Sequence, residues 1–306
     1  MLAEVSAELV DRPCSTEEEL LAHAAGADAL LTLDEPITAR VVAGLTRCRV
    51  ISRFGIGVDK VDVEAATAAG IYVTNVPDYC IDEASDHALA LLLAVARRLL
   101  PLDRAVRRGE WDTPGVAGPV HRLAGRVLGI VGLGRIGGRL AEKARALGLE
   151  VQAHDPYLED AELAGRGVKP VALDELLRTS DVVSLHMPLT PGTRHLLDGE
   201  RLRAMKPGAV LLNVSRGALV DEEALAEALE EGRLAGAGID VFEREPPAAG
   251  NPLLTLPNVV LTSHAAFYSV EALADMRRKA FLNVTQVLRG EPPPYPVNRP
   301  RARTAR

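Results

Sequence analysis

The chain has 306 residues, of which 47% are hydrophobic and 25% are charged, and its formal net charge at pH 7 is −7. At about 100 to 200 residues per domain, this length predicts two domains with a sizeable core. The acidic net charge argues against a nucleic-acid partner. The longest apolar run, residues 88–96, is shorter than the roughly 18 residues that a membrane-spanning helix needs, so we expect no membrane partner.

The cysteines indicate neither a disulfide framework nor a metal site. Cys14, Cys48 and Cys80 are odd in number, lie far apart in the sequence and form no CxxC pair. The first residues carry acids where a signal peptide would carry a basic segment before a long apolar stretch. We therefore expect a cytoplasmic protein without a bound metal.

Short apolar runs alternate with helical stretches from the start of the chain to Cys80. The runs that we interpret as strands are 7–11, 27–33, 49–55 and 71–77, and stretches with helical character lie between them. Strands that alternate with helices predict a parallel sheet covered on both faces.

A long helix is predicted from Ile81 to about Leu100, with Asp82 as its cap. Its apolar content suggests burial between domains or at a subunit contact. Residues 109–118, which include Trp111, break the periodicity and predict an extended arm or loop. A last helix is expected from Ser269 to about Leu288, and the arginine-containing end of the chain is interpreted as a solvated tail.

A second alternating series begins near residue 126 and continues to His264. Its pattern is that of a doubly wound, Rossmann-type parallel sheet. The sequence therefore predicts an α/β protein in which this sheet forms the larger domain and the segment that ends at Cys80 belongs to a second, smaller one.

The motif G-L-G-R-I-G follows an apolar strand directly and opens a helix, which is the context that a dinucleotide-binding loop requires. Gly132 permits the tight turn, Gly134 permits close approach of a pyrophosphate, and Gly137 permits close packing of helix and strand. We expect Arg135 and Ile136 to line the phosphates at the helix N-terminus.

Asp155 follows the next predicted strand, close to the expected position about 20 residues after the glycine motif. A carboxylate at this place accepts hydrogen bonds from the ribose hydroxyls of NAD and repels the 2′-phosphate of NADP. The residues that follow, Pro156 and Tyr157, offer no cation for that phosphate. The predicted cofactor is therefore NAD.

Three ionisable residues follow strands of the second series, at the edge where open parallel sheets bind ligands: Arg216, Glu245 and His264. Hydride transfer to a keto acid requires a cation that polarises the carbonyl and a proton donor near neutral pH. Histidine is the natural donor, and a neighbouring carboxylate favours its charged form and fixes its tautomer.

At these residues the chain resembles the D-isomer-specific 2-hydroxyacid dehydrogenase family. The segments that carry the resemblance run in family order through nearly the whole chain: FGIGVDKVD, NVP, GLGRIG, DPY, LHMPLT, NVSRGALVDEEAL, DVFEREPP and SHAAFYS. HAAFYS and HDPYL are most similar to the branch of the C-terminal-binding-protein corepressors and their bacterial relatives, which has Trp where this chain has Phe267.

The resemblance implies that His264 is the acid/base, Glu245 its partner and Arg216 the cation that orients the substrate. It also implies further positions near the nicotinamide and its ribose, with Asp240 on the carboxamide: Pro188, Thr193, Val214 and Asp240. The backbone amides from Gly55 through Ile56 and Gly57 to Val58, helped by Arg53, would bind the substrate carboxylate, and Phe267 would form an aromatic wall.

The resemblance further implies a flavodoxin-like substrate-binding domain of residues 1–80 and 270–306, apparently without its first strand, and an NAD-binding domain of residues 81–269. A homodimer is expected through the helix from Ile81 and the arm around Trp111. The cleft between the domains is expected to hold the substrate.

The function expected is hydride transfer between NAD(H) and a D-2-hydroxy acid or 2-keto acid. Two alternatives remain at this point, an NAD(H)-regulated corepressor-like binding protein and a 3-phosphoglycerate dehydrogenase. Glyoxylate or hydroxypyruvate reduction fits the sequence equally well, because the spacing of the motifs does not identify the substrate side chain.

Overall fold

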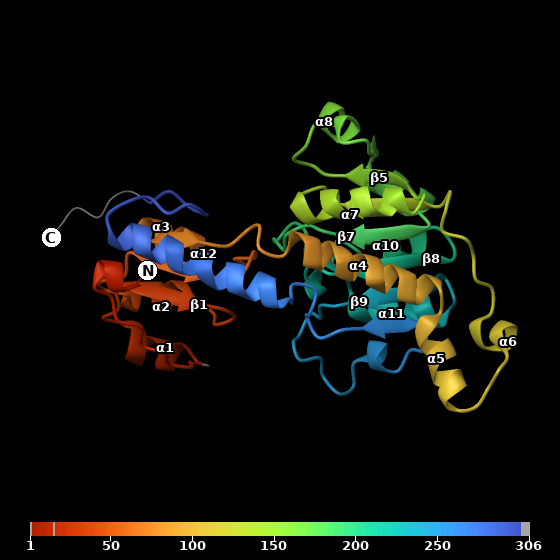
Figure 1. The fold of residues 1–306 in the computed structure, drawn as a ribbon, viewed down its shortest axis with the longest axis horizontal. Helices are drawn as coiled ribbons and strands as arrows, with labels where there is room; N and C mark the ends of the chain where they lie inside the picture. The colour runs from red at the N-terminus through yellow and green to blue at the C-terminus, as the bar shows by residue number, and fades with distance from the viewer. Residues whose placement is uncertain (1, 15, 301–306) are drawn as a thin grey trace. The chain divides into compact units, whose positions relative to one another are not determined.

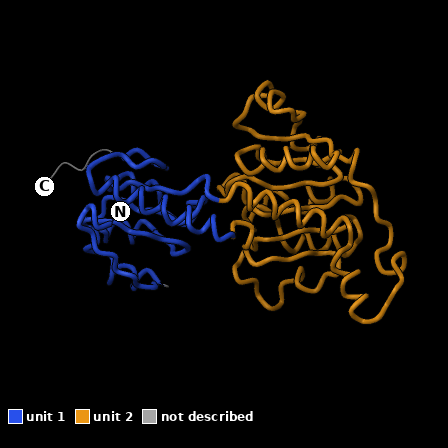
Figure 2. The backbone as a smooth tube through the Cα atoms, in the orientation of Figure 1, with its two compact units in different colours: residues 1–79, 269–306 blue, residues 80–268 orange. Residues whose placement is uncertain are grey.

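The computed structural model describes residues 2–14 and 16–300, and the chain divides into two compact units (Figure 2). Unit 1 comprises residues 1–79 and 269–306, and unit 2 comprises residues 80–268. These bounds differ by one residue at each crossover from those expected. Residues 301–306 of the predicted tail lie outside the described residues.

Unit 1 is built on three parallel strands in the order β1-β2-β3, namely Ala29–Thr32, Val50–Arg53 and Tyr72–Thr74. The short helices between them pack together in one buried cluster, and the C-terminal helix packs with β2 in another. Figure 1 shows these elements in chain order, with helices α1 Glu17–Ala24, α2 Ala39–Gly44, α3 Val63–Ala68 and α12 Val270–Leu288.

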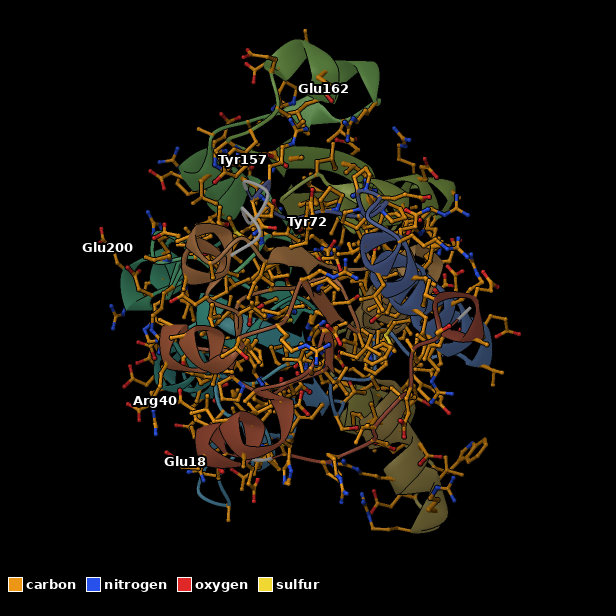
Figure 3. All side chains as sticks on the ribbon, turned by 90° about the vertical axis from the view of Figure 1, so that its left-hand side faces the viewer. Glu18, Arg40, Tyr72, Tyr157, Glu162 and Glu200 are labelled. Carbon is orange, nitrogen blue, oxygen red and sulfur yellow. The ribbon has the colours of Figure 1, made fainter. Side chains whose placement is uncertain are left out.

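The helices of unit 1 begin where the sequence supplies side-chain caps. Thr16 and Glu19 form a capping box at α1, and Ser269 accepts the amide hydrogen of Ala272 at 2.8 Å at the start of α12, where the helix was predicted. On the surface of these helices, Arg40 donates to Glu18 over 2.7 Å (Figure 3). Because both side chains are exposed, this ion pair adds little stability.

The strand predicted at residues 7–11 is wrong. A 3₁₀ turn, η1 Leu2–Val5, is followed by irregular backbone, and no strand precedes β1 within residues 2–14 and 16–28. Leu9 and Val10 are 55% and 64% exposed, so this apolar run buries too little surface to pair with the sheet.

Unit 2 contains a seven-stranded parallel sheet in the order β10-β9-β8-β7-β4-β5-β6. Its first and fourth strands in sequence, β4 and β7, are neighbours, and this reversal of strand order confirms the predicted Rossmann-type sheet. The strands are β4 Val127–Val131, β5 Glu150–His154, β6 Lys169–Pro170, β7 Val182–Leu185, β8 Ala209–Asn213, β9 Leu234–Ile239 and β10 Val259–Leu261.

Two buried clusters cover the two faces of this sheet. One joins the strands to α4 and α7, and the other joins them to helices from the second half of the unit. No helix among residues 2–14 and 16–300 is both long and apolar enough to cross a membrane. The helices are α4 Ile81–Ala96, α5 Leu99–Arg107, α6 Thr113–Ala117, α7 Arg135–Ala146, α8 Asp160–Gly165, α9 Leu173–Thr179, α10 Gly199–Ala204 and α11 Glu222–Glu230, with 3₁₀ turns η2 Gly217–Leu219 and η3 Pro252–Leu254.

The helix predicted from Ile81 to about Leu100 is two helices. Arg98 has a left-handed backbone with φ of +54°, which ends α4 and turns the chain into α5. Asp82 was wrongly predicted as the cap, since Cys80 is the N-cap residue and makes no side-chain cap bond. The predicted arm or loop at 109–118 also contains a short helix, α6, capped by Asp112.

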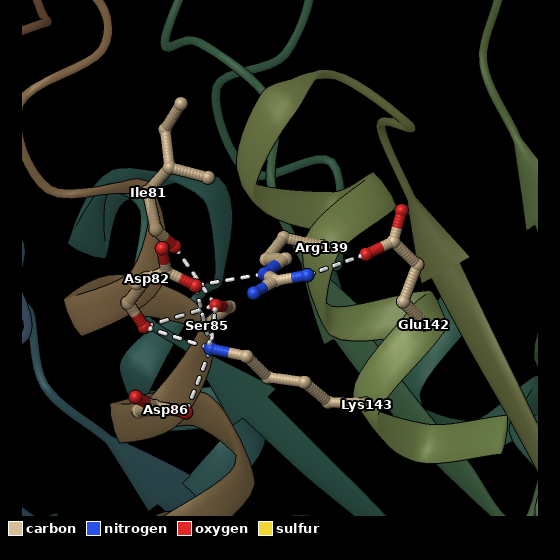
Figure 4. Close-up of polar contacts among 7 residues, drawn as sticks. All are labelled: Ile81, Asp82, Ser85, Asp86, Arg139, Glu142 and Lys143. Atoms are coloured by element: carbon tan, nitrogen blue, oxygen red, sulfur yellow. Dashed lines mark hydrogen bonds and ion pairs between the residues drawn. The ribbon is translucent and has the colours of Figure 1, made fainter. Parts of the chain in front are cut away.

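Asp82 contributes instead to a polar contact between α4 and α7 (Figure 4). Arg139 donates to its carboxylate over 2.7 Å, and the Lys143 ammonium lies 2.8 Å from the Ser85 hydroxyl and 2.7 Å from the Asp86 carboxylate. These contacts fix α7, whose N-terminus follows the glycine-rich loop, against the first helix of the unit.

We predict that Asp181→Asn destabilises unit 2 by about 2 kcal/mol, the scale of hydrogen bonds to a charged group. The Asp181 carboxylate lies 2.7 Å from Arg126, 2.8 Å from Lys206 and 3.0 Å from the amide of Val127. Burial raises its pKa, but Lys206, this amide and the Arg126 charge together hold the pKa below its ordinary value.

A carboxyl group whose pKa is lowered by folding stabilises the folded state fully at pH values above its pKa in the unfolded chain, about 3.9. This stabilisation is lost as the pH falls through the lower pKa of the folded state. Denaturant unfolding at pH 7 and at pH 3 measures the difference between Asp181→Asn and the parent. The difference should shrink at the lower pH, and an equal difference at both would contradict the assignment.

Candidate active site and dinucleotide-binding loop

The glycine-rich loop between β4 and α7 is closed to larger residues at two positions. Gly132 has φ of +92°, and a Cβ atom there would lie 2.7 Å from the backbone oxygen of His186. A Cβ atom on Gly137 would lie 2.3 Å from the Gly132 oxygen. Gly134 has open space beside it and is the N-cap of α7, so the loop leaves room for a pyrophosphate at the helix N-terminus. Arg135 and Ile136 form its first turn, and Arg135 is exposed.

Asp155 lies directly after β5 and reaches the same loop. Its carboxylate accepts the amide hydrogens of Leu133 at 2.8 Å and Tyr157 at 2.9 Å. Arg166, which follows α8, donates to the Leu133 carbonyl over 2.9 Å. An acid, Asp155, and a cation, Arg166, therefore both bind the backbone of Leu133. Only Asp155 was expected from the sequence, because Arg166 lies far from the glycine motif along the chain.

The loops after β7 and β8 bring the other predicted cofactor residues to this end of the sheet. The Thr193 hydroxyl lies 2.9 Å from the Pro188 carbonyl and 2.7 Å from the amide of Thr190, so it closes the turn after β7. Val214 follows β8 and is partly buried.

His264 and Glu245 form a hydrogen-bonded pair. The Nδ1 atom of His264 lies 2.7 Å from Oε2 of Glu245, and Oε1 of the same carboxylate accepts the amide hydrogen of Phe242 at 3.0 Å. Burial raises the pKa of Glu245, but the bonds from His264 and Phe242 and the charges of His264 and Arg216 together hold the pKa below its ordinary value. The carboxylate is therefore ionised at neutral pH, and as an acceptor it requires a hydrogen on Nδ1.

Arg216 lies on the loop after β8, close enough to contribute to the electrostatics of Glu245. Nη1 of Arg216 donates to the Ser215 carbonyl over 2.7 Å, and the backbone carbonyl of Arg216 accepts a hydrogen bond from the side-chain amide of Asn213 at 2.8 Å. The next residue must be glycine, since a Cβ on Gly217 would lie 1.9 Å from the backbone of Phe242. The loops that carry Arg216 and Glu245 are therefore in direct contact.

Asp240 follows β9 and is fully buried. Its backbone oxygen accepts the amide hydrogen of His264 at 2.7 Å, and its carboxylate accepts those of Ala265 and Ala266 at 2.8 and 3.0 Å. Burial raises the pKa of Asp240, but bonds from His87, Thr262 and these two amides together lower the pKa below its ordinary value. Asp240 thus binds the segment that carries His264.

In unit 1, the predicted substrate turn follows β2. Gly55 has φ of +131°, and its carbonyl accepts from the amide of Val76 at 2.8 Å. The carbonyl of Ile56, which precedes Gly57, accepts from the Asn75 side chain at 2.7 Å. Arg53 is the last residue of β2, and its guanidinium lies 3.5 Å from the carboxylate of Asp34, which follows β1.

Phe267 lies in unit 2, where its ring meets the His264 imidazole edge to face at 6.2 Å between centroids. The Phe267 ring therefore lies beside the histidine, and its role as an aromatic wall for the substrate stays a prediction.

The sequence profile of the D-isomer specific 2-hydroxyacid dehydrogenase NAD-binding domain matches residues 89–266. The chain belongs to this family. A glyoxylate reductase of Korarchaeum cryptofilum is 44% identical over 276 residues, which cover 89% of this dehydrogenase and 82% of the relative. A D-3-phosphoglycerate dehydrogenase of Methanocaldococcus jannaschii is 40% identical over 93% of this chain, which spans only 54% of that protein.

Among solved structures, the D-lactate dehydrogenase of Aquifex aeolicus in complex with NAD and lactic acid has a TM-score of 0.83 and 30% identity, covering 89% of this chain and 86% of that one. The dehydrogenase is thus an NAD-dependent oxidoreductase with a Rossmann-type domain, as the sequence predicted. Similarity to the corepressor branch stays a prediction.

Sequence reasoning did not single out His87 or Thr262, which contact Asp240. His87 belongs to α4 and Thr262 follows β10, so no local motif links them. The signal that could have found Thr262 is its place directly after a strand, two positions before His264.

Proposed function

We propose that this dehydrogenase reduces a small, unbranched 2-keto acid of the glyoxylate or hydroxypyruvate kind with NADH to the 2-hydroxy acid, which is the D-isomer where C2 of the product is chiral. The observation that carries the reaction type is the pair of His264 and Glu245, 2.7 Å apart, with Arg216 on the adjoining loop. The substrate class is supported by the similarity to the glyoxylate reductase of Korarchaeum cryptofilum. A cation and a carboxylate-supported imidazole are what reduction of a carbonyl beside a carboxylate requires.

NADH, when bound, would supply the hydride to the carbonyl carbon. Because Glu245 accepts the hydrogen of Nδ1, the proton that His264 gives to the carbonyl oxygen leaves from Nε2. Arg216 polarises the carbonyl and balances the charge that develops on its oxygen. In the oxidative direction Nε2 takes the hydroxyl proton back.

The remaining predicted residues are assigned as binding groups. We infer that the amides of Gly55, Ile56 and Gly57, with Arg53, bind the substrate carboxylate, and that Phe267 limits the substrate side chain. Four further residues would contact the nicotinamide or its ribose: Pro188, Thr193, Val214 and Asp240. Asp155 would accept hydrogen bonds from the ribose of the adenosine half.

A spectrophotometric screen with NADH tests the proposed substrate class. Glyoxylate, hydroxypyruvate, pyruvate and phenylpyruvate are compared at equal concentration, and 3-phosphoglycerate is offered with NAD. We expect the highest kcat/KM for glyoxylate or hydroxypyruvate. Dominant oxidation of 3-phosphoglycerate, which the Methanocaldococcus relative suggests as the second candidate, would replace the proposal. Absence of turnover with all of them would favour a corepressor-like binding function.

We predict that Asp155→Ser weakens NADH binding by about 10- to 100-fold, the scale of a hydrogen bond to a charged group. NADPH binding should improve in the same variant, since the repelling carboxylate is gone and the guanidinium of Arg166 stays near the loop. Fluorescence titration of each cofactor measures both constants. The exposed Asp160→Ser is the matched control, and an unchanged NADH to NADPH preference would contradict the role of Asp155.

The cytoplasmic location and the homodimer stay predictions. Exposed apolar side chains on α5 and the segment after it support homodimer formation. Leu99 and Val106 are each 53% exposed, and Trp111 is 91% exposed. Apolar surface that gathers on one segment favours a protein partner.

A further inference from the structure

The Asp240 carboxylate is the centre of a buried polar network in unit 2. The residue is 0% exposed, and each of its two oxygens accepts an amide hydrogen from the segment after His264. Oδ1 also accepts from the Thr262 hydroxyl at 2.6 Å. A buried carboxylate is stable only when its acceptors are filled in this way.

The network holds a strained piece of backbone. His264 has φ of +53°, a left-handed conformation that is uncommon for residues other than glycine. The amides of Ala265 and Ala266, both bound to Asp240, follow it directly. The position of the Asp240 carboxylate therefore fixes the direction in which the His264 side chain leaves the chain.

His87 completes the network from α4. Its Nε2 lies 2.9 Å from the Thr262 hydroxyl oxygen and 3.4 Å from Oδ1 of Asp240. The single hydrogen of that hydroxyl is directed to Asp240, because an ionised carboxylate can only accept. His87 must therefore donate from Nε2, and the hydrogen on this atom is fixed by the geometry.

We propose that His87 is a positioning residue for the reaction, which acts through Thr262 and Asp240 on the backbone of His264. The inference rests on the proposed function of His264. The His87 contacts run through Thr262 and Asp240 to the backbone of His264, so removal of His87 should disturb the placement of the proton donor more than the binding of the cofactor.

Substitution separates the donated hydrogen bond from simple space filling. His87→Leu removes the donor, while His87→Gln keeps an N–H near the position of Nε2. We expect His87→Leu to lower kcat for the keto acid about 10- to 100-fold, as a small misplacement of a catalytic group does. The Kd for NADH should change much less than kcat, and His87→Gln should recover most of kcat, which identifies an effect mainly on the chemical step.

The exposed His121→Leu is the matched control and should leave kcat unchanged. Thr262→Val should reproduce the loss in His87→Leu, and Thr262→Ser, which keeps the hydroxyl, should not. Equal losses in the Leu and Gln variants, together with a lowered Tm, would overturn the proposal, because His87 would then only fill space.

Proton–nitrogen correlation NMR of the imidazoles tests the network without turnover. The His87 signal, assigned by its absence in His87→Gln, should show hydrogen on Nε2 whether the ring is neutral or charged. A neutral ring with hydrogen on Nδ1 alone would overturn the inference. If this tautomer is found but no keto acid is reduced, the proposed function fails and the network stands.

Discussion

Replacing His264 by Gln is expected to lower kcat about 10²- to 10⁴-fold, the usual contribution of a general acid. Gln keeps a polar side chain of similar size but cannot release a proton from the position of Nε2. The hydrogen bond to Glu245 can persist, so the fold of the loops should be retained. Steady-state kinetics with the best keto acid and fluorescence titration of NADH measure the two quantities.

The Kd for NADH in this variant should lie within about twofold of the parent, since only the chemical step loses a group. His121→Gln, at an exposed position, serves as the matched control. Unchanged turnover in His264→Gln would remove this residue from the mechanism.

Replacing Arg216 by Gln is expected to lower kcat/KM about 10²- to 10³-fold, the scale seen when one donor to a developing oxyanion is lost. The loop that carries Arg216 is fixed by Asn213 and by the close approach of Gly217 to Phe242. The variant should therefore lose the charge without losing the loop. Arg216→Lys should recover only part of the rate, because an ammonium cannot reproduce the planar fork of the guanidinium.

The control is Arg244→Gln, an exposed arginine beside Glu245 in the same segment. Kinetics of the three variants with one keto acid, together with circular dichroism to verify folding, complete the experiment. A loss in Arg244→Gln as large as that in Arg216→Gln would mean that the general charge of the segment, and not Arg216, matters.

The parts of the site that the sequence predicted are those in which a local motif fixes the geometry. The GLGRIG motif requires glycine at the positions where a Cβ atom would overlap with backbone atoms. Its position between a strand and a helix was predicted from the sequence alone. Arg216, Glu245 and His264 each follow a strand or lie in the loop after one, so the parallel sheet brings them to one edge.

The parts that the sequence did not predict depend on contacts between distant segments or on single backbone angles. His87 reaches Asp240 from a helix far away along the chain, and Arg166 reaches Leu133 from the end of α8. The end of α4 depends on the left-handed angle of Arg98, a residue type that normally continues a helix. The run at 7–11 has the composition of a strand but no partner that would bury it.

Transfer of deuterium from the cofactor to the product tests the proposed hydride transfer to C2 of the keto acid. The protein is incubated with hydroxypyruvate and NADH that carries deuterium at both C4 positions of the nicotinamide, and the product is analysed by chiral chromatography with mass spectrometry. We expect the parent to form a D-2-hydroxy acid with one deuterium on C2, and His264→Gln to form it at least about 100-fold more slowly. An L-configured product, or a product without deuterium on C2, would contradict the proposal.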